Sequence, residues 1–178
     1  MWEMYSGKVT STMSAIEPEK LDKALSWFRQ SINDSKTIWV IGNGGSAATS
    51  SHFSVDLSKG SALRINKKVR AIALMDHVPT QSAWSNDTSY EAALANTVDN
   101  FAQEGDIVFS ISGSGNSMNI VNALVTAKAM KVQTIGLTGF DGGKIGQLVD
   151  LEINVPSKDM QIIEDVHHII CHYLSREI

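Results

Sequence analysis

A run of hydroxyl side chains and glycines, SGSGNS, is the part of this sequence best suited to holding an anion. It places Ser112, Ser114 and Ser117 around Gly113 and Gly115, at the end of the apolar run DIVFSIS. Glycines let backbone amides come close to a phosphate, and the positive end of the helix expected next would point at the same place. The pattern predicts a phosphate site made of hydroxyls and amides. Serine and glycine are also common in turns and helix caps, so a purely structural role stays open.

A second glycine-rich loop, GNGGS, follows the apolar run TIWVIG and contains Asn43, Gly44 and Ser46. Its spacing differs from the dinucleotide-binding pattern G-x-G-x-x-G, which would need a glycine at Ala47, and no Gly-Lys-Ser/Thr follows as in a P-loop. Alone, the loop is a weak signal, because any tight turn from a strand to a helix can carry glycines. Two such loops at strand ends in one small domain indicate a shared binding site.

Ionisable side chains recur at helical spacing in two places. His52 and Asp56 are four residues apart in a stretch expected to be helical, so they share one face. Near the end of the chain, Glu164, His168 and His172 also recur every four residues. Side chains of these types can transfer protons or bind a metal, and His168 is left without an assigned role. Solvated faces and packed helices carry similar residues, so the spacing alone does not decide between these roles.

The elements that must position these residues alternate between strand and helix. Five runs are nearly continuous in apolar residues, as in parallel strands covered on both faces: Thr37–Gly42, Val69–Leu74, Asp106–Ser112, Val132–Thr138 and Leu151–Val155. Helices are expected over Pro18–Asn33, Ser46 to about Lys59, Thr88–Gln103, Ser117–Met130 and Asp159–Arg176. The alternation predicts an α/β fold, a three-layer αβα sandwich around a five-stranded parallel sheet. Ligands bind at the carboxyl ends of such strands, where both glycine-rich loops and the turn TGFDGG would meet.

Size and composition fit a single domain over residues 1–178, with an N-terminal extension (1–16), an N-terminal helix (17–34) and an α/β core with a C-terminal helix (35–178). A net charge of -4 without a basic stripe argues against nucleic acid as a partner. No stretch approaches the roughly 20 apolar residues of a membrane span, and the first residues do not resemble a signal peptide. The single cysteine, Cys171, fits a reducing, cytoplasmic location.

Taken in order, the motifs GNGGSA, HF, ND, SGSGNS, LTGFDGG and EDVHHIICH resemble the sugar isomerase (SIS) domain family, and most closely its phosphoheptose isomerase branch. The resemblance extends from about Leu21 to Ile178. It implies the flavodoxin-like SIS fold and an aldose–ketose isomerase that works through an enediol, converting sedoheptulose 7-phosphate to D-glycero-D-manno-heptose 7-phosphate. It also implies a homotetramer with sites between subunits and a role in making heptose for surface polysaccharides.

The resemblance assigns roles to individual positions. It implies that Asp56 is the general base and His172 the general acid. Several family members bind zinc at the positions that match His52, Asp56, Glu164 and His172, and imidazoles and carboxylates are suitable Zn²⁺ ligands. The positions that match the family's substrate-binding residues are Asn43, Gly44, Ser46, Asn86, Asp87, Ser112, Gly113, Ser114, Asn116, Ser117 and Glu164.

Three positions depart from the family pattern: Asp56 replaces a glutamate, Gly60 an arginine and Glu164 a glutamine. The shorter side chain of Asp56 would misplace the base unless the backbone compensates. Glu164 and His172 are separated by a helical rise of about 12 Å, so either they ligate from neighbouring subunits or one of them is no ligand. Two alternatives therefore stay open: a non-catalytic module that binds a phosphosugar or a protein, and an isomerase for another ketose or hexose phosphate.

Overall fold

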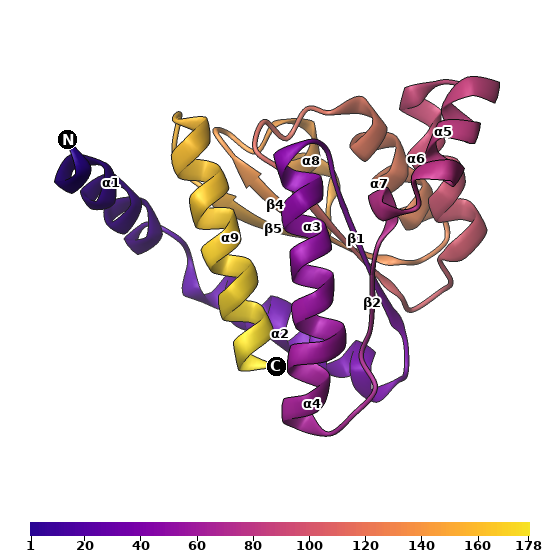
Figure 1. Ribbon diagram of the computed structural model, residues 1–178, viewed down its shortest axis with the longest axis horizontal. Helices are drawn as coiled ribbons and strands as arrows, with labels where there is room; N and C mark the ends of the chain where they lie inside the picture. Colours follow the sequence, from indigo (N-terminus) through magenta and orange to yellow (C-terminus); the bar gives the residue numbers. More distant parts are fainter.

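Five parallel strands form the central sheet of the computed structural model, which describes residues 1–178 (Figure 1). The strands are β1 (Thr37–Gly42), β2 (Arg70–Ala73), β3 (Ile107–Ser112), β4 (Gln133–Gly139) and β5 (Leu151–Val155). Their order in the sheet is β2-β1-β3-β4-β5, and every neighbouring pair is parallel. This is the order of flavodoxin-like, doubly wound sheets. The predicted α/β fold with a five-stranded parallel sheet is confirmed.

The register of the strands brings their carboxyl ends to one edge of the sheet. Gly42, the last residue of β1, pairs with Ile111 of β3. Ser112, the last residue of β3, pairs with Thr138 of β4. The loops GNGGS, SGSGNS and TGFDGG therefore leave the sheet together, as the sequence predicted.

One face of the sheet carries the helices that hold the ionisable residues: α2 (Pro18–Asn33), α3 (Gly45–Val55) and α9 (Met160–Glu177). Three phenylalanines, Phe28 of α2, Phe53 of α3 and Phe109 of β3, pack beneath them with ring centroids 5.2, 5.7 and 6.1 Å apart. Because their apolar sides face this core, α3 and α9 lie side by side over the sheet (Figure 1).

The opposite face is covered by α6 (Tyr90–Phe101), α7 (Met118–Ala129) and α8 (Gly143–Leu148). Ser89 caps α6, since its side chain accepts a hydrogen bond from the amide of Ala92. The two helical layers complete the predicted αβα sandwich. No helix of the chain is long and apolar enough to cross a membrane.

Two helices that the sequence did not predict lie on the surface: α1 (Trp2–Ser14) and α5 (Val78–Asp87). No residue of either helix is fully buried. In α1 the side chains of Tyr5, Val9 and Met13 recur every four residues and pack, partly buried, against the core, whereas α5 has no such stripe. α1 projects from the body of the chain (Figure 1) and contacts α9, where the Tyr5 hydroxyl donates a 2.7 Å hydrogen bond to Asp165. The N-terminal extension is therefore largely helical.

The edge strand β2 is shorter than the predicted run Val69–Leu74 and is not covered on both faces. Arg70 is exposed and Ile72 is 36% exposed, whereas the side chains between and after them are buried. An edge strand has a neighbour on one side only, and here one of its faces also meets solvent. A 3₁₀ turn over Leu74–Asp76 follows the strand directly.

The long helix predicted after the GNGGS loop changes type midway. α3 ends at Val55, residues Asp56–Ser61 form a π-helix, and α4 (Ala62–Ile65) completes the stretch. Turns of π-helix are rare and are found frequently at functional sites. Here the π-helix starts at Asp56, the position of the predicted general base.

A substitution of Gly60, inside this π-helix, tests whether the backbone needs a glycine at this position. A Cβ added at Gly60 would meet nothing within 4 Å. Glycine in a helix is less favourable than alanine by about 0.5–1 kcal/mol. We therefore expect Gly60→Ala to raise the free energy of unfolding by about 0.5–1 kcal/mol in urea denaturation.

Gly142→Ala is the matched control for this substitution. Gly142 has a φ of 83°, and an added Cβ would clash with the carboxylate of Glu152. This variant should be less stable than the native chain. A loss of stability in Gly60→Ala as well would show that the π-helix itself needs a glycine.

Candidate active site

The SGSGNS loop turns sharply at the end of β3, and none of its three hydroxyls donates a hydrogen bond within the chain. The amide of Gly115, a residue with a φ of 64°, donates to Ser112 Oγ, and the amide of Asn116 donates to Ser114 Oγ, each at 3.2 Å. Ser117 occupies the N-cap of α7, but its side chain does not cap the helix. The Ser117 hydroxyl and the first amides of α7 are therefore free to bind an anion, which a purely structural cap would not be.

The GNGGS loop needs its glycines partly for its own geometry. A Cβ on Gly42 would lie 2.6 Å from the carbonyl oxygen of Ser46, and Gly44 has a φ of 53°. The loop thus closes tightly over the end of β1 and starts α3. The Ser46 hydroxyl is left without a hydrogen bond inside the chain, in contrast to that of Ser50, which donates to the Ser46 carbonyl oxygen.

Asn43 links this loop to α7 and α6. Its side-chain amide exchanges two 2.8 Å hydrogen bonds with Asn119, and the hydroxyl of Tyr90 donates to Asn43 Oδ1 at 2.9 Å. Asn119 is buried, so the pair fixes the amide of Asn43 at the carboxyl edge of the sheet. The sequence did not predict a role for Asn119 or Tyr90, since neither lies in a recognisable motif.

Asn86 and Asp87 lie at the end of α5 and are both exposed. The Asn86 side chain donates to Asp87 Oδ1 at 2.9 Å. No hydrogen bond or ion pair joins either side chain to the loops, although Tyr90, three residues after Asp87, donates a hydrogen bond to Asn43. The structure brings their segment close to the GNGGS loop without placing either side chain in it.

A cavity of about 670 Å³ opens beside the SGSGNS loop. Its walls come from the loops after β3, β4 and β5 and consist of Ser114, Asn116, Phe140, Asp141, Pro156, Ser157 and Lys158. Backbone hydrogen bonds from Gly139 to the carbonyl of Gly113 and from Ile145 to that of Gly115 hold the first two loops together. The cavity does not include His52, Asp56 or His172.

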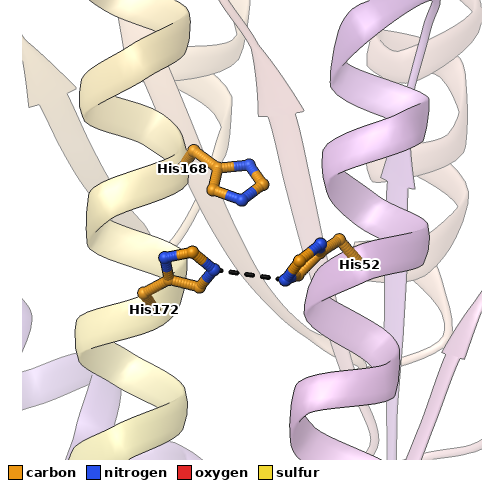
Figure 2. Close-up of side chains that lie close together, drawn as sticks. All are labelled: His52, His168 and His172. Atoms are coloured by element: carbon orange, nitrogen blue, oxygen red, sulfur yellow. Dashed lines mark hydrogen bonds between the residues drawn. The ribbon is translucent and has the colours of Figure 1, made fainter.

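The ionisable residues of α3 and α9 meet between the two helices (Figure 2). His52 Nε2 and His172 Nε2 are 3.2 Å apart, so one nitrogen must donate and the other accept in the absence of an ion. Asp56 Oδ2 lies 3.4 Å from His52 Nε2 and 3.7 Å from His172 Nε2. Three predicted site residues therefore come together within one chain. Asp56 reaches both imidazoles although it is one methylene shorter than glutamate, from the first residue of the π-helix.

Glu164 is not part of this group. Its carboxylate lies against the start of α3, where Oε1 would be 3.5 Å from a Cβ added to Gly45. Within one chain, the helical rise of about 12 Å between Glu164 and His172 keeps Glu164 beside the GNGGS loop. A ligand role for Glu164 together with His52 and His172 would need a second subunit.

His168, to which the sequence assigned no role, joins the group instead. Its ring centroid lies 4.8 Å from that of His52 and 4.5 Å from that of His172. Burial and the neighbouring imidazoles of His172 and His52 lower the pKa of His168 below its usual value. The repeat of Glu164, His168 and His172 every four residues was the signal in the sequence.

His167, next to it, faces the core rather than the site. Its side chain is buried, and Nε2 donates to the carbonyl oxygen of Thr138 at 3.0 Å. Burial lowers the pKa of His167 to about 4, so the imidazole is neutral at pH 7. His167 ties α9 to the end of β4 and thereby helps to position the loops of the site.

This pKa predicts how stability depends on pH. Between pH 6.5 and about 4 the unfolded chain binds a proton at His167 and the folded chain does not, so stability falls as the pH falls through this window. The contribution is about 1.4 kcal/mol per pH unit. In urea denaturation from pH 7 to pH 4.5, His167→Gln should lose this part of the pH dependence. His77→Gln, at an exposed position, should keep it, and equal slopes in both variants would contradict the assignment.

A family model and several relatives match most of this chain. Residues 3–139 match the model of the SIS domain. The phosphoheptose isomerase of Aliarcobacter butzleri is 37% identical over 175 residues, which cover 96% of this chain and 90% of that protein. The chain belongs to the SIS domain family. This SIS domain also shares its fold with two solved phosphoheptose isomerases.

The structure from Francisella tularensis matches with a TM-score of 0.90 at 28% identity and covers 98% of this chain and 92% of that one. The structure from Neisseria gonorrhoeae matches with a TM-score of 0.89, also at 28% identity, over 96% of this chain and 91% of that one. The family that the motifs predicted, and its phosphoheptose isomerase branch, are confirmed by these relatives.

Proposed function

We propose that this SIS domain is an aldose–ketose isomerase that converts sedoheptulose 7-phosphate to D-glycero-D-manno-heptose 7-phosphate. The observation that carries the proposal is the group of Asp56, His52 and His172, which places a carboxylate within 3.7 Å of two imidazoles. Such a group can both accept and donate protons, as enediol chemistry requires. The names of the relatives, phosphoheptose isomerases in each case, support the substrate.

The phosphate of the substrate would bind at the SGSGNS loop. Ser112, Ser114 and Ser117 offer hydroxyls, and the start of α7 offers amides and the positive end of its dipole. Ser46 adds a hydroxyl from the GNGGS loop. These groups bind the dianion without a lysine or arginine, and they fix one end of the sugar while its carbonyl end reacts.

The reaction moves one proton between two carbons. Asp56 takes a proton from C1 of the ketose while His172 gives a proton to the oxygen at C2, which forms the enediol. The proton on the oxygen at C1 then leaves and a proton is returned to C2, which forms the aldose. Each proton that is taken is given back, so the two residues end the cycle in their starting states.

The group also fits a divalent metal such as Zn²⁺. Two ligands of one tetrahedral zinc ion, each about 2.0–2.1 Å from it, are about 3.3–3.4 Å apart. The separations of 3.2 Å between the imidazole nitrogens and 3.4 Å between Asp56 and His52 are close to this value. His52, Asp56 and His172 would hold the ion, with Glu164 of a second subunit as a further candidate. A bound ion would stabilise the negative charge of the enediolate.

A second subunit is needed to close the site. The side chains of His52, Asp56 and His172 are 50%, 30% and 52% exposed in one chain, whereas isomerases exclude water from the enediol. The cavity beside the phosphate loop contains none of these three residues. We propose a homotetramer in which the loops of one subunit face the acid and base of another. The exposed helix α1 is available for such assembly.

The proposal also includes the setting of the enzyme: the cytoplasm, and a pathway that supplies heptose for surface polysaccharides. The lone, buried Cys171 has no partner for a disulfide, which agrees with a reducing compartment.

The test is to incubate the purified, zinc-supplemented protein with sedoheptulose 7-phosphate and to follow the sugar by NMR. Appearance of the aldoheptose 7-phosphate is the expected result. Binding of the ketose phosphate without turnover would indicate an isomerase for another sugar phosphate. If the protein neither turns over nor binds the sugar, it is a non-catalytic SIS module and the proposal is wrong.

A further inference from the structure

We propose that His168 is a metal ligand, so that His52, His168 and His172 of a single subunit hold a divalent ion through three imidazoles. The inference rests on the metal site of the proposed function and changes its ligands, because His168 takes the place considered for Glu164. It follows from the packing of α3 against α9.

The three imidazoles converge in the space between the two helices. Figure 2 shows His52 on α3 pointing toward His168 and His172 on α9. One potential ligand atom from each of the three residues can be chosen so that all lie within 4.8 Å of one another. Two ligand atoms on one zinc ion are about 3.3–3.4 Å apart, so the nitrogens that now lie up to 4.8 Å apart must approach by about 1–1.5 Å. Rotation of the imidazole side chains can supply this movement.

The spacing along α9 supports the same ligands. His168 and His172 are four residues apart, and two histidines at this spacing on one helical face form a recurrent zinc-binding pair. Their ring centroids are 4.5 Å apart. α3 contributes His52 with Asp56 four residues later, so each helix presents two donors to the same space. No hydrogen bond or ion pair occupies the His168 side chain.

Glu164 is a poorer candidate within the subunit. It lies two turns earlier on α9 and contacts the start of α3 rather than the histidines. α3 and α9 run in the same direction, and Gly45 at the start of α3 lies beside Glu164 of α9. Residues further along α3 therefore lie beside residues further along α9, and His52 contacts His168 and His172. The position of Glu164 suits contact with a substrate at the GNGGS loop instead.

Three imidazole ligands would leave Asp56 free for the reaction. Catalytic zinc sites have three protein ligands and an open fourth position. Asp56 Oδ2 lies 3.4 and 3.7 Å from two of the imidazole nitrogens, so the carboxylate would stay next to the three histidines, where it can take the carbon-bound proton. In the metal-bound enzyme, Nε2 of His172 would be a ligand, so His172 could not protonate the oxygen at C2. Asp56 would still move the carbon-bound proton from C1 to C2, the ion would supply charge stabilisation for the enediolate, and the hydroxyl proton would pass from the C1 oxygen to the C2 oxygen directly or through water.

The test measures metal binding directly, in the full chain. Zn²⁺ affinity is measured by competition with a chromophoric chelator, and the visible absorption of the Co²⁺-loaded protein reports the ligand set. We expect His168→Ala to weaken Zn²⁺ binding by more than about 100-fold, beyond the cost of losing an outer-shell partner, and to change the Co²⁺ spectrum. His168→Asn, closer to histidine in shape, should behave in the same way if the folded structure is kept, as judged by circular dichroism.

Glu164→Ala and His77→Ala are the matched controls, and both should bind Zn²⁺ within about threefold of the native chain, less than the tenfold that 1.4 kcal/mol represents. Native affinity in His168→Ala, an equal loss in Glu164→Ala, or no Zn²⁺ binding by the native chain would each overturn the ligand assignment. Turnover of sedoheptulose 7-phosphate in any of these cases would leave the proposed isomerase standing. If the native chain binds Zn²⁺ in a way that depends on His168 but does not turn over sedoheptulose 7-phosphate, the ligand assignment stands and the proposed isomerase is wrong.

Discussion

Asp56→Asn is expected to lower kcat for sedoheptulose 7-phosphate by about 10²–10⁴-fold, the usual contribution of a general base. The amide has nearly the size of the carboxylate but cannot accept a proton from carbon. Because Asp56 is separate from the serines that bind phosphate, KM should change by less than about threefold. Initial rates of aldose formation over a range of substrate concentrations give both constants. An equal loss in kcat is expected for His172→Gln, whether His172 donates a proton or binds the metal.

Asp56→Glu tests whether the position of the carboxylate matters for catalysis or only its presence. Glutamate is the residue of the resembled family at this position, but the π-helix that starts here already brings the shorter side chain to 3.4 Å from His52. The longer side chain should therefore overshoot and lower kcat by more than about tenfold, as misplacement by about an ångström can do. Full activity in Asp56→Glu would show that the π-helix has no part in positioning the base, and full activity in Asp56→Asn would exclude Asp56 as the base.

Mixing two inactive variants is expected to restore activity. If the phosphate loop of one subunit works with the acid and base of another, an oligomer of Asp56→Asn and Ser114→Ala/Ser117→Ala subunits contains some sites with both halves native. Random association of equal amounts gives about a quarter of such sites, so about a quarter of the native rate. The two chains carry different affinity tags, are co-expressed, and are purified over both tags before the assay.

Each variant purified alone is the control for this experiment and should stay inactive. Mixed oligomers that are as inactive as the separate variants would place the whole site within one subunit. The half-exposed state of His52 and His172 would then need another explanation, such as closure of a loop over them.

Much of the fold follows from local patterns in the sequence. The limits of β1, β5 and α2 agree with the predicted Thr37–Gly42, Leu151–Val155 and Pro18–Asn33. These segments have clear physical signals, namely short apolar runs bounded by polar turns, and a proline at the first position of an amphipathic helix. α5 has no buried face and gives no such signal, whereas the repeat of Tyr5, Val9 and Met13 every four residues in α1 was a signal in the sequence that was missed.

The π-helix and the edge strand could not be predicted for a different reason. A π-helix over Asp56–Ser61 has no sequence signal that sets it apart from an ordinary helix, and the segment packs against α9 and β2, which are distant along the chain. The exposure of Ile72 likewise depends on β2 lying at the edge of the sheet, which is a property of the strand order.

For the site as well, some features could be predicted from the sequence and others depend on how the helices pack. The sequence placed the loops correctly because parallel strands end at one edge, and it placed His52 beside Asp56 because they are four residues apart. It could not tell which residue of α9 faces His52, since this depends on how far one helix is shifted along the other. That shift puts Glu164 beside Gly45 and His168 beside His52.

The central claim is that this SIS domain moves a proton between two carbons of a sugar phosphate, and the most direct measurement is the reaction in D₂O. The native protein is incubated with sedoheptulose 7-phosphate, and both sugars are analysed by NMR. Proton transfer through a side chain, unlike a hydride shift, lets the proton on Asp56 exchange with solvent each time the site opens. The account predicts deuterium at C2 of the aldose phosphate, and none with Asp56→Asn. A protein that binds the ketose phosphate but forms no aldose would contradict the account.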